Sequence, residues 1–398
     1  MTATVPLKDL CDLITKGTTP TSIGFDFADN GIGFLRVQNI SGGAVNFEGD
    51  TLFIDEQVHQ SLRRSQIFPG DVLLSIAGSI GRTGVVPDHA PPLNCNQAVA
   101  ILRSSEKVHR PFLRNWLECE DAQKQMRGAT VTGTIQNLSL TQIGELKISL
   151  PPLPEQRRIA AILDQADALR AKRREALAQL DSLTQSIFID MFGDPGNNPM
   201  GWPEKKLGEL IVGKPNNGIF KKNEEYGEGM PVAWVEELFR GNAIDISESR
   251  RLQPTLKEVE QYGLRNGDVL FCRSSLKLAG IGYNNVYLGE DNKALFECHI
   301  IRVSPDKSKI ASAFLNFALR MPNQRRKLFK FAKTVTMSTI DQDGLQQISL
   351  PVPPLETQEL FSERLKAIDG VRRQHHATTK EFDTLFASLQ HRAFRGEL

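Results

Sequence analysis

The sequence predicts an α+β protein with two tandem mixed α/β domains, each followed by one long helix. The two helices are expected to pair as an antiparallel coiled coil with pseudo-two-fold symmetry. Two observations predict this class. Two long stretches repeat apolar side chains at alternating steps of three and four. The whole order of strands, helix and apolar stretch also occurs twice. The predicted domains are residues 1–150 and 196–352, and the predicted spacer helices are residues 151–195 and 353–398.

The first domain reads as mixed α/β with much strand. Apolar and β-branched runs bounded by Gly, Pro, Asn or Asp predict strands at Phe34–Val37, Asp71–Ile76, Ala98–Leu102 and Leu146–Leu150. A helix is predicted over Pro111–Met126, because Pro suits a first helical turn.

The first long helix follows a proline cluster (Pro151, Pro152 and Pro154) and contains neither Pro nor Gly from Glu155 to Phe192. At ~1.5 Å per residue it measures roughly 57 Å. Arg173 takes one charged place in its apolar seam. A helix with such a stripe packs lengthwise on another helix.

A second copy supplies that partner. A shift of 202 positions aligns Gln156 with Gln358, and the same shift aligns most of the two stretches. The copy is less regular, since Gly370 interrupts it at a cost of ~1 kcal/mol. The second domain also repeats the first: Gly267–Phe271 matches Gly70–Leu74, and residues 335–340 match residues 131–135.

Connectivity favours an antiparallel pair. The loop from Phe192 to Trp202 spans at most ~35 Å, which is less than the length of the first helix. A parallel pair is not excluded, because the second domain could cover part of the difference. The predicted helix-pair or partner interface consists of Ile159, Ile162, Leu169, Leu180, Leu183, Ile187, Phe361, Ile368, Val371, Phe382, Leu385 and Leu389.

The composition bounds the function. With 40% apolar and 24% charged residues and a net charge of +1, the chain has ordinary soluble composition. No apolar run or signal-peptide start indicates a membrane or exported protein. The five cysteines form no CxxC pair and have no His at ligand spacing, which suits a reducing cytoplasm and argues against zinc. Signatures of nucleotide hydrolases, metalloproteases, serine hydrolases, amino-methyltransferases and nucleases are missing, which favours a binding protein.

Nucleic-acid candidates stand out in three places. The run from Arg320 to Lys333 holds six basic residues, no acidic one and two Phe, which fits phosphate contacts but equally a solvated helix face. Polar side chains near strand ends could reach base edges, although a structural glycine turn is the alternative there. The candidates are Arg36, Gln38, Asn39, Ser75, Ser79, Arg82, Asn96 and Gln97 in the first domain, and Lys214, Asn216, Asn217, Lys221, Lys222, Arg273, Ser274, Lys277, Arg325, Arg326 and Lys330 in the second.

These residues resemble the specificity (S) subunits of type I restriction–modification systems over nearly the whole chain. The resemblance rests on a strand and proline entry that occur twice, at Ile148–Gln156 and Ile348–Gln358, and on Gly70–Arg82 with Asn96-Gln97. The second domain departs from the pattern. Arg273–Lys277 replaces the Gly-Ser-Ile-Gly turn, and Cys298-His299 stands near the Asn-Gln position.

The resemblance implies that each domain is a target-recognition domain for one half of a bipartite double-stranded DNA target. The helices would set the gap between the halves and dock two methylation (M) subunits. The chain would have no catalysis and no cofactor of its own. S-adenosylmethionine, ATP and Mg would belong to the M subunits and the restriction (R) subunits of a cytoplasmic complex.

Two alternatives stay open at this point. The chain could be a coiled-coil scaffold that binds only protein, in which case it would show no DNA dependence at low salt. It could also be a nuclease or methyltransferase with unrecognised motifs, which would act on DNA without partners.

Overall fold

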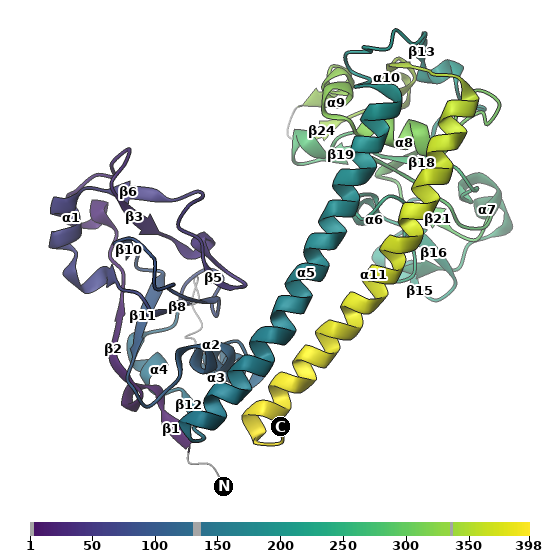
Figure 1. Cartoon of the computed structure of the whole chain (residues 1–398). Coiled ribbons are helices and arrows are strands. Elements are labelled where there is room, and N and C mark those ends of the chain that lie inside the picture. Colours follow the sequence, from purple (N-terminus) through teal and green to yellow (C-terminus); the bar gives the residue numbers. More distant parts are fainter. Residues whose placement is uncertain (1–3, 130–136, 335–336) are drawn as a thin grey trace. The chain divides into compact units, whose positions relative to one another are not determined.

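The computed structural model describes residues 4–129, 137–334 and 337–398 (Figure 1). The predicted match between residues 131–135 and 335–340 lies partly outside these ranges. The chain divides into two compact units. Unit 1 is Met1–Arg174 with Ala377–Leu398, and unit 2 is Glu175–His376. Each unit combines one folded domain with part of both long helices. Within the described ranges, no helix has the length and apolar character needed to cross a membrane.

The described part of unit 1 contains two sheets and a short ribbon. The larger sheet has the strand order β2 (Cys11–Lys16), β11 (Val99–Ser104), β8 (Val72–Ser75), β9 (Thr83–Val85), β5 (Gly43–Val45) and β4 (Ile40–Ser41). The smaller sheet has the order β6 (Leu52–Ile54), β3 (Ile32–Leu35), β10 (Leu93–Cys95) and β7 (Gln66–Ile67). The ribbon pairs β1 (Thr4–Pro6) with β12 (Lys147–Ser149). The predicted strands are confirmed to within a few residues.

The helices of unit 1 are α1 (Glu56–Ser61), α2 (Arg110–Leu117), α3 (Glu120–Ala129) and α4 (Leu140–Gly144). The prediction of one helix over Pro111–Met126 is wrong, because the chain breaks between α2 and α3. Gln123 Nε2 donates to the carbonyl of Leu117 (2.8 Å) and to that of Gly81 (3.1 Å). A side chain thus satisfies a carbonyl that a continuous helix would have satisfied.

Unit 2 repeats much of this pairing. One sheet has the order β14 (Asn216–Asn217), β22 (Ile300–Val303), β18 (Val269–Cys272) and β20 (Asn284–Val286). A second has the order β15 (Tyr226–Gly227), β17 (Arg251–Leu252), β16 (Met230–Ala233) and β21 (Leu295–Phe296). A third has the order β19 (Ser274–Ser275), β24 (Ser338–Thr339) and β23 (Lys333–Thr334), and a ribbon pairs β13 (Glu204–Lys206) with β25 (Ser349–Pro351).

The duplication is visible in strand direction. The pair β16–β21 is parallel, as is β3–β10 in unit 1. The pairs β18–β22 and β8–β11 are both antiparallel. The helices of unit 2 are α6 (Val235–Leu238), α7 (Leu256–Tyr262), α8 (Ser312–Arg320), α9 (Pro322–Phe329) and α10 (Gln342–Gln346).

The two long helices are α5 (Leu153–Phe192) and α11 (Leu355–Arg395). Helix α5 begins at Leu153, two residues after the start of the predicted spacer segment 151–195 and two residues before the stretch without Pro or Gly. Pro154 therefore lies in its first turn, where a missing N–H leaves no hydrogen bond unmade. The buried Gln156 side chain accepts from His109 N (2.8 Å) and donates to Pro151 O (2.9 Å).

Gln358 occupies the equivalent place in unit 2. Its side chain is buried, accepts from Ala311 N (2.8 Å) and donates to Pro353 O (2.8 Å). Each glutamine thus joins the start of a long helix to the start of α2 or α8. This contact explains why the sequence carries glutamine at both aligned positions.

Within unit 1, the first part of α5 lies along the last part of α11. Arg170 Nε donates to Asp383 Oδ1 (2.7 Å), and its guanidinium lies 4.3 Å from the centre of the Phe386 ring. Arg158 Nη2 donates to Leu398 O (2.9 Å). Arg158, which comes earlier on α5, contacts the last residue of the chain, whereas Arg170, which comes later, contacts Asp383. The two helical segments therefore run in opposite directions.

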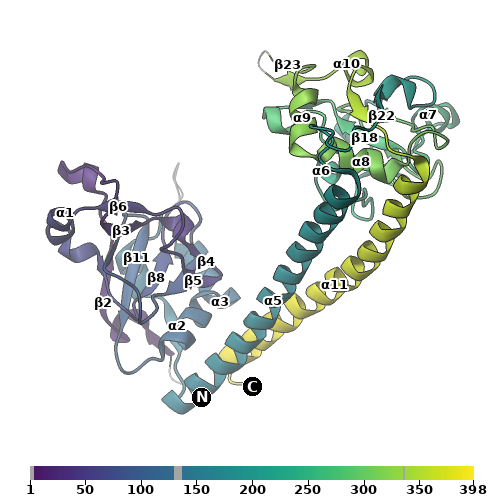
Figure 2. The ribbon, with the colours of Figure 1, turned by 45° about the horizontal axis from the view of Figure 1, so that its top comes forward.

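Within unit 2, the last part of α5 lies along the first part of α11 (Figures 1 and 2). Arg372 is buried and donates to Asp181 Oδ1 (2.7 Å) and to Asp369 Oδ1 (2.5 Å). The shift of 202 positions converts the Arg170–Asp383 pair into this Arg372–Asp181 pair. Each unit therefore contains the same interhelical ion pair.

The residues of the predicted helix-pair or partner interface differ in exposure. Four of its members are between 46% and 52% exposed, namely Leu169, Leu183, Val371 and Leu385. The others are buried or partly buried, namely Ile159, Ile162, Leu180, Ile187, Phe361, Ile368, Phe382 and Leu389. The inward positions lie one residue further on, at Leu163 and Arg170 in unit 1 and at Thr184 and Phe188 in unit 2. Charged side chains thus replace leucines on part of the inner face.

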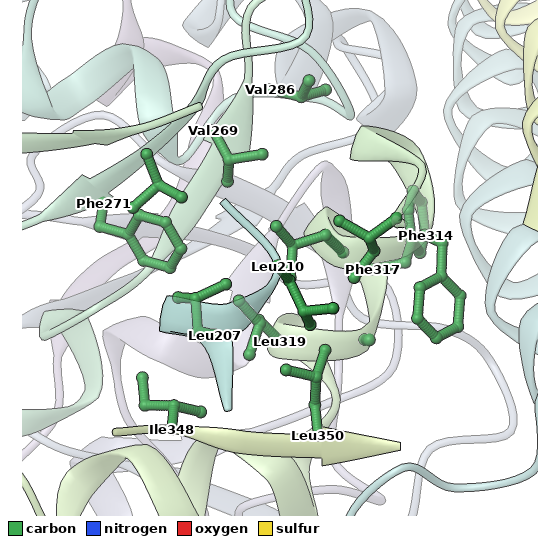
Figure 3. Close-up of a cluster of buried hydrophobic side chains, with 14 of the residues drawn as sticks. Leu207, Leu210, Val269, Phe271, Val286, Phe314, Phe317, Leu319, Ile348 and Leu350 are labelled. Carbon is green, nitrogen blue, oxygen red and sulfur yellow. The ribbon is translucent and has the colours of Figure 1, made fainter. Parts of the chain in front are cut away.

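The long helices also complete the hydrophobic core of each unit. In unit 2, Phe188 and Phe192 of α5 and Phe361 of α11 pack with Phe314 of α8, with Phe192 and Phe314 centroids 4.8 Å apart. Figure 3 shows other members of this core converging from the segment at Leu207, from β18, from α8 and from β25 at Leu350. In unit 1, Ile159 and Leu163 of α5 and Ala393 of α11 join the main core in the same way.

Candidate nucleic-acid interface

Backbone hydrogen bonds bring three predicted segments of unit 1 together. Asn96 N donates to Leu35 O (3.1 Å), the residue before Arg36, and Ile76 N donates to Ala98 O (2.8 Å). Residues 36–39, 75–82 and 96–97 therefore meet at one end of β3, β8 and β10. We call this surface the unit 1 edge.

Asp50 organises the first of these segments. Arg36 Nη2 and Gln38 Nε2 approach its carboxylate at 3.2 Å and 3.1 Å. Asn39 is buried, accepts from Arg36 N (2.8 Å) and donates to Asp50 O (3.1 Å). Asn39 thus shapes the turn, while Arg36 and Gln38 stay at the surface beside a carboxylate.

The second segment is a tight turn closed by Ser75. This buried side chain donates to Ser79 O (2.5 Å) and accepts from Arg82 N (2.8 Å). Ser79 and Arg82 are exposed. The structural alternative therefore holds for Ser75, while Ser79 and Arg82 remain available to a ligand.

The third segment likewise has one side chain that supports a turn and one that is exposed. Asn96 Oδ1 accepts from Ala98 N (3.2 Å), so this side chain supports the turn. Gln97 is exposed and bonds to Thr19.

Unit 2 builds an equivalent edge with different side chains. Ile219 N donates to Phe296 O (2.9 Å), and Arg273 N donates to His299 O (2.7 Å). Residues 218–222, 273–277 and 297–299 therefore meet, and we call this surface the unit 2 edge. Arg273 and Lys277 are exposed, and so is Lys222. Lys221 is held by Glu225 (3.2 Å) and Glu258 (3.0 Å).

Ser274 is half-buried in β19, where it pairs with Thr339 of β24. It contributes to the frame of the unit 2 edge.

Three predicted residues lie away from this edge or serve the fold. Asn216 Oδ1 accepts from Arg302 Nε (3.1 Å), and its amide donates to Gln261 O (3.2 Å). Its neighbour Asn217 is half-buried in the same strand, β14. Lys214 lies at the other end of β22, where it lines a cavity of about 590 Å³ with Lys307.

The basic residues in and just after helix α9 also divide into one that serves the fold and two that are exposed. Arg325 Nη2 donates to Ala279 O (2.6 Å) and Ile281 O (3.0 Å), and its guanidinium lies 5.3 Å from the centre of the Tyr283 ring. Burial lowers the pKa of Arg325. This arginine fastens the segment that follows β19, whereas Arg326 and Lys330 are exposed.

Among the described residues, one group could offer a metal three ligand atoms, from Glu297, Cys298 and His299. The expectation that no histidine stands at ligand spacing from a cysteine meets one exception here, because Cys298 Sγ lies 3.5 Å from His299 Nδ1. However, Glu297 Oε2 already accepts from His299 N (2.9 Å). Burial, followed by the Glu297 charge, raises the pKa of the Cys298 thiol. The group therefore reads as a turn between β21 and β22.

Three residues at these edges were not predicted from the sequence. Asp50 was missed because carboxylates are not expected to face DNA. Phe220 and Leu276 are 75% and 83% exposed on the unit 2 edge. Their signal is present in the sequence, since each large apolar residue stands directly before a lysine.

The exposed helix positions form a matched set. Leu169 and Leu385 belong to unit 1, and Leu183 and Val371 belong to unit 2. The shift of 202 positions relates Leu169 to Val371 and Leu183 to Leu385. Each unit therefore presents an equivalent pair of apolar side chains to solvent.

Comparison with known proteins also finds the duplication. The family described as "Type I restriction modification DNA specificity domain" matches residues 2–179 and 199–381. The type I restriction enzyme StySPI specificity subunit of Salmonella potsdam is 23% identical over 421 residues, covering 100% of this chain and 89% of its own. The EcoBI specificity subunit of Escherichia coli is 30% identical over 416 residues, covering 97% and 84%.

Solved structures share the fold. The S subunit of a type I restriction–modification system from M. genitalium has a TM-score of 0.55 at 17% identity, covering 98% of this chain and 96% of its own. A chain from work on complex assembly and conformational transition of the type I R–M system has a TM-score of 0.54 at 19% identity, covering 100% and 98%.

Proposed function

This chain belongs to the type I restriction–modification DNA specificity family and is a non-catalytic DNA-recognition subunit, and from that membership we propose that each domain reads one half of a bipartite duplex target. The observation that carries the proposal is the pair of edges. Each gathers exposed polar and basic side chains from three separated segments, as contact with base edges and phosphates requires.

The two edges differ in chemistry, so the two half-targets differ. The unit 1 edge offers Gln97, Ser79 and Arg82, which suit hydrogen bonding to purine edges in the major groove. The unit 2 edge is more basic, with Arg273, Lys277 and Lys222 exposed.

The long helices then set the gap between the halves as an antiparallel coiled coil. Equivalent contacts in the two units support this. The Arg170–Asp383 pair recurs as Arg372–Asp181. Repetition of the same interhelical contact is what pseudo-two-fold symmetry produces, and protein symmetry fixes half-site spacing.

The helices also dock two methylation subunits. The exposed apolar side chains support this, because each unit offers the same pair and a second copy of one partner can use it. Those subunits would bring S-adenosylmethionine, and restriction subunits would add ATP and Mg chemistry, in the cytoplasm. Base flipping by such partners removes the need for a catalytic pocket here.

The test is selection of binding sites from randomised duplex DNA by the full chain co-expressed with its methylation subunit. We expect two short motifs at one fixed separation. Arg82→Ala should alter only one motif, and Arg273→Ala should alter only the other. Lys214→Ala, which lies away from the unit 2 edge within its own unit, is the matched control and should leave both motifs intact. A single enriched motif, or both edge variants altering the same motif, would contradict the proposal.

A further inference from the structure

The strand-end loops of the two edges are structurally equivalent. In unit 1, Leu138 N donates to Ile76 O (2.9 Å) and Ala77 pairs with Asn137. In unit 2, Ile340 N donates to Arg273 O (2.9 Å) and Ser274 pairs with Thr339. The loops that follow, residues 78–82 and 275–280, therefore leave the same frame.

Their tips carry opposite side chains. The tip in unit 1 exposes Gly78 and Ser79, which are small and polar. The tip in unit 2 exposes Leu276, with 83% of its surface open to solvent, followed by the exposed Lys277. A leucine held this far out of the core gains nothing from folding, because its apolar surface stays in water.

The unit 2 loop is held in place by several contacts. Lys277 N donates to Ser275 Oγ (3.2 Å), and Gly280 N donates to Lys277 O (2.9 Å). Arg325 fastens the next residues through Ala279 O (2.6 Å). The protruding leucine therefore stands on a pre-formed turn, and little further conformational freedom is lost when a ligand covers it.

The surroundings of Leu276 identify that ligand. Arg273 and Lys277 on the same loop are exposed cations, and Lys222 and the 75% exposed Phe220 lie on the neighbouring segment. A polyanion satisfies the cations. An apolar side chain among them needs an apolar surface within the same polyanion, which in duplex DNA is the face of the stacked bases.

We propose that Leu276 is a wedge that inserts between neighbouring base pairs of the half-target read by unit 2. The inference rests on the proposed function of the unit 2 edge. Insertion unstacks one step and kinks the duplex, so unit 2 favours sequences with an easily deformed step at that position. Unit 1, which has Ser79 at the equivalent tip, leaves its half-target stacked.

The test places 2-aminopurine at successive positions of a duplex that carries the selected two-part site, and adds the full chain with its co-expressed methylation subunit. We expect fluorescence to rise at one step in the unit 2 half, since unstacking relieves quenching. Leu276→Ala should abolish the rise and weaken binding about tenfold. Leu276→Phe should retain the rise. Leu256→Ala is the matched control, because Leu256 is 89% exposed at the start of α7.

Each other outcome is decisive. If Leu276→Ala leaves the fluorescence rise in place, insertion by this residue is refuted. If it weakens binding with no rise in the wild type, the leucine packs on a base edge without inserting, which also overturns the wedge. In both cases, loss of affinity in Lys277→Ala would show that DNA recognition by unit 2 stands. If neither variant affects binding, the proposed function of the unit 2 edge fails as well.

Discussion

Gln358 joins the start of α11 to the rest of unit 2, and its replacement by leucine should weaken that unit. The side chain is fully buried and makes two hydrogen bonds of 2.8 Å, from Ala311 N and to Pro353 O. Leucine has a similar volume, so Gln358→Leu removes polar contacts without opening a cavity.

The magnitude follows from the two backbone groups left without partners. A buried polar group that loses its partner costs about 1–3 kcal/mol, so the loss of both predicts roughly 3 kcal/mol after partial relaxation. With a denaturant dependence of about 3 kcal/mol per molar urea, the midpoint of unfolding should fall by about 1 M. Gln156→Leu should act similarly on unit 1, because Gln156 makes the equivalent contacts.

Equilibrium urea unfolding followed by tryptophan fluorescence measures this change, since Trp202 and Trp234 report on unit 2 and Trp116 on unit 1. The control is Gln185→Leu, the same substitution at an exposed position of α5 in unit 2. If Gln358→Leu and Gln185→Leu unfold at the same midpoint, the two hydrogen bonds do not stabilise the junction and the reasoning is refuted.

Three further predictions concern the helices and the edges. Gly370→Ala should raise the free energy of unfolding by about 0.5–1 kcal/mol, measured by urea unfolding, because α11 continues through Gly370 and no atom lies within 4 Å of an added Cβ. Burial raises the pKa of Asp369 and Arg372 opposes that rise. Arg372→Leu should raise the pKa further, so that the folded state binds the extra proton and urea unfolding shows stability falling as pH rises above 3.8. Lys277→Ala should reduce the slope of log affinity against log salt by about 1, whereas Lys214→Ala should leave it unchanged.

For each of these three variants, one result would contradict the structural reasoning. A Gly370→Ala chain that unfolds earlier would mean that the helix needs the glycine. A flat pH profile for Arg372→Leu would mean that Asp369 escapes to solvent. Equal salt slopes for the two lysine variants would remove Lys277 from the DNA contact.

The long helices could be predicted because their signal is local and repeated. The proline entry, the absence of Pro and Gly from Glu155 to Phe192 and the recurrence of glutamine after 202 positions all act within a few turns of helix. Helix α11 tolerates Gly370 because its packing in unit 2 outweighs a propensity cost of about 1 kcal/mol.

The inner face of the helix pair could not be predicted in the same way. An apolar pattern counts leucine and not arginine as an inward-facing residue, so the pattern predicts Leu169 rather than Arg170 at the helix interface. The structure turns Arg170 inward because Asp383 and the Phe386 ring receive its guanidinium. A half-buried cation is acceptable where acceptor groups stand at hydrogen-bonding distance. For Arg170 one such acceptor, Asp167, is local, but Asp383 is 213 residues away in the sequence.

The candidate DNA-binding residues also could be predicted only in part from the sequence. Residue type alone identified Arg273, Lys277 and Arg82 as candidates for DNA contact. Residue type could not separate them from Arg325 or Asn39, whose side chains donate hydrogen bonds to backbone carbonyls within the fold. Nor could it find Leu276, because exposure of an apolar side chain is a property of the folded surface.

By itself the sequence determined the duplication, the two mixed domains, the two long helices and the family to which the chain belongs. These depend on local pattern and on repetition, which are written in the order of residues. Only the tertiary structure decided which helix face points inward, which polar side chains hold turns and which remain exposed at the two edges. Those outcomes depend on partners distant in sequence, because a charged or polar group can be buried only where the fold supplies its hydrogen bonds.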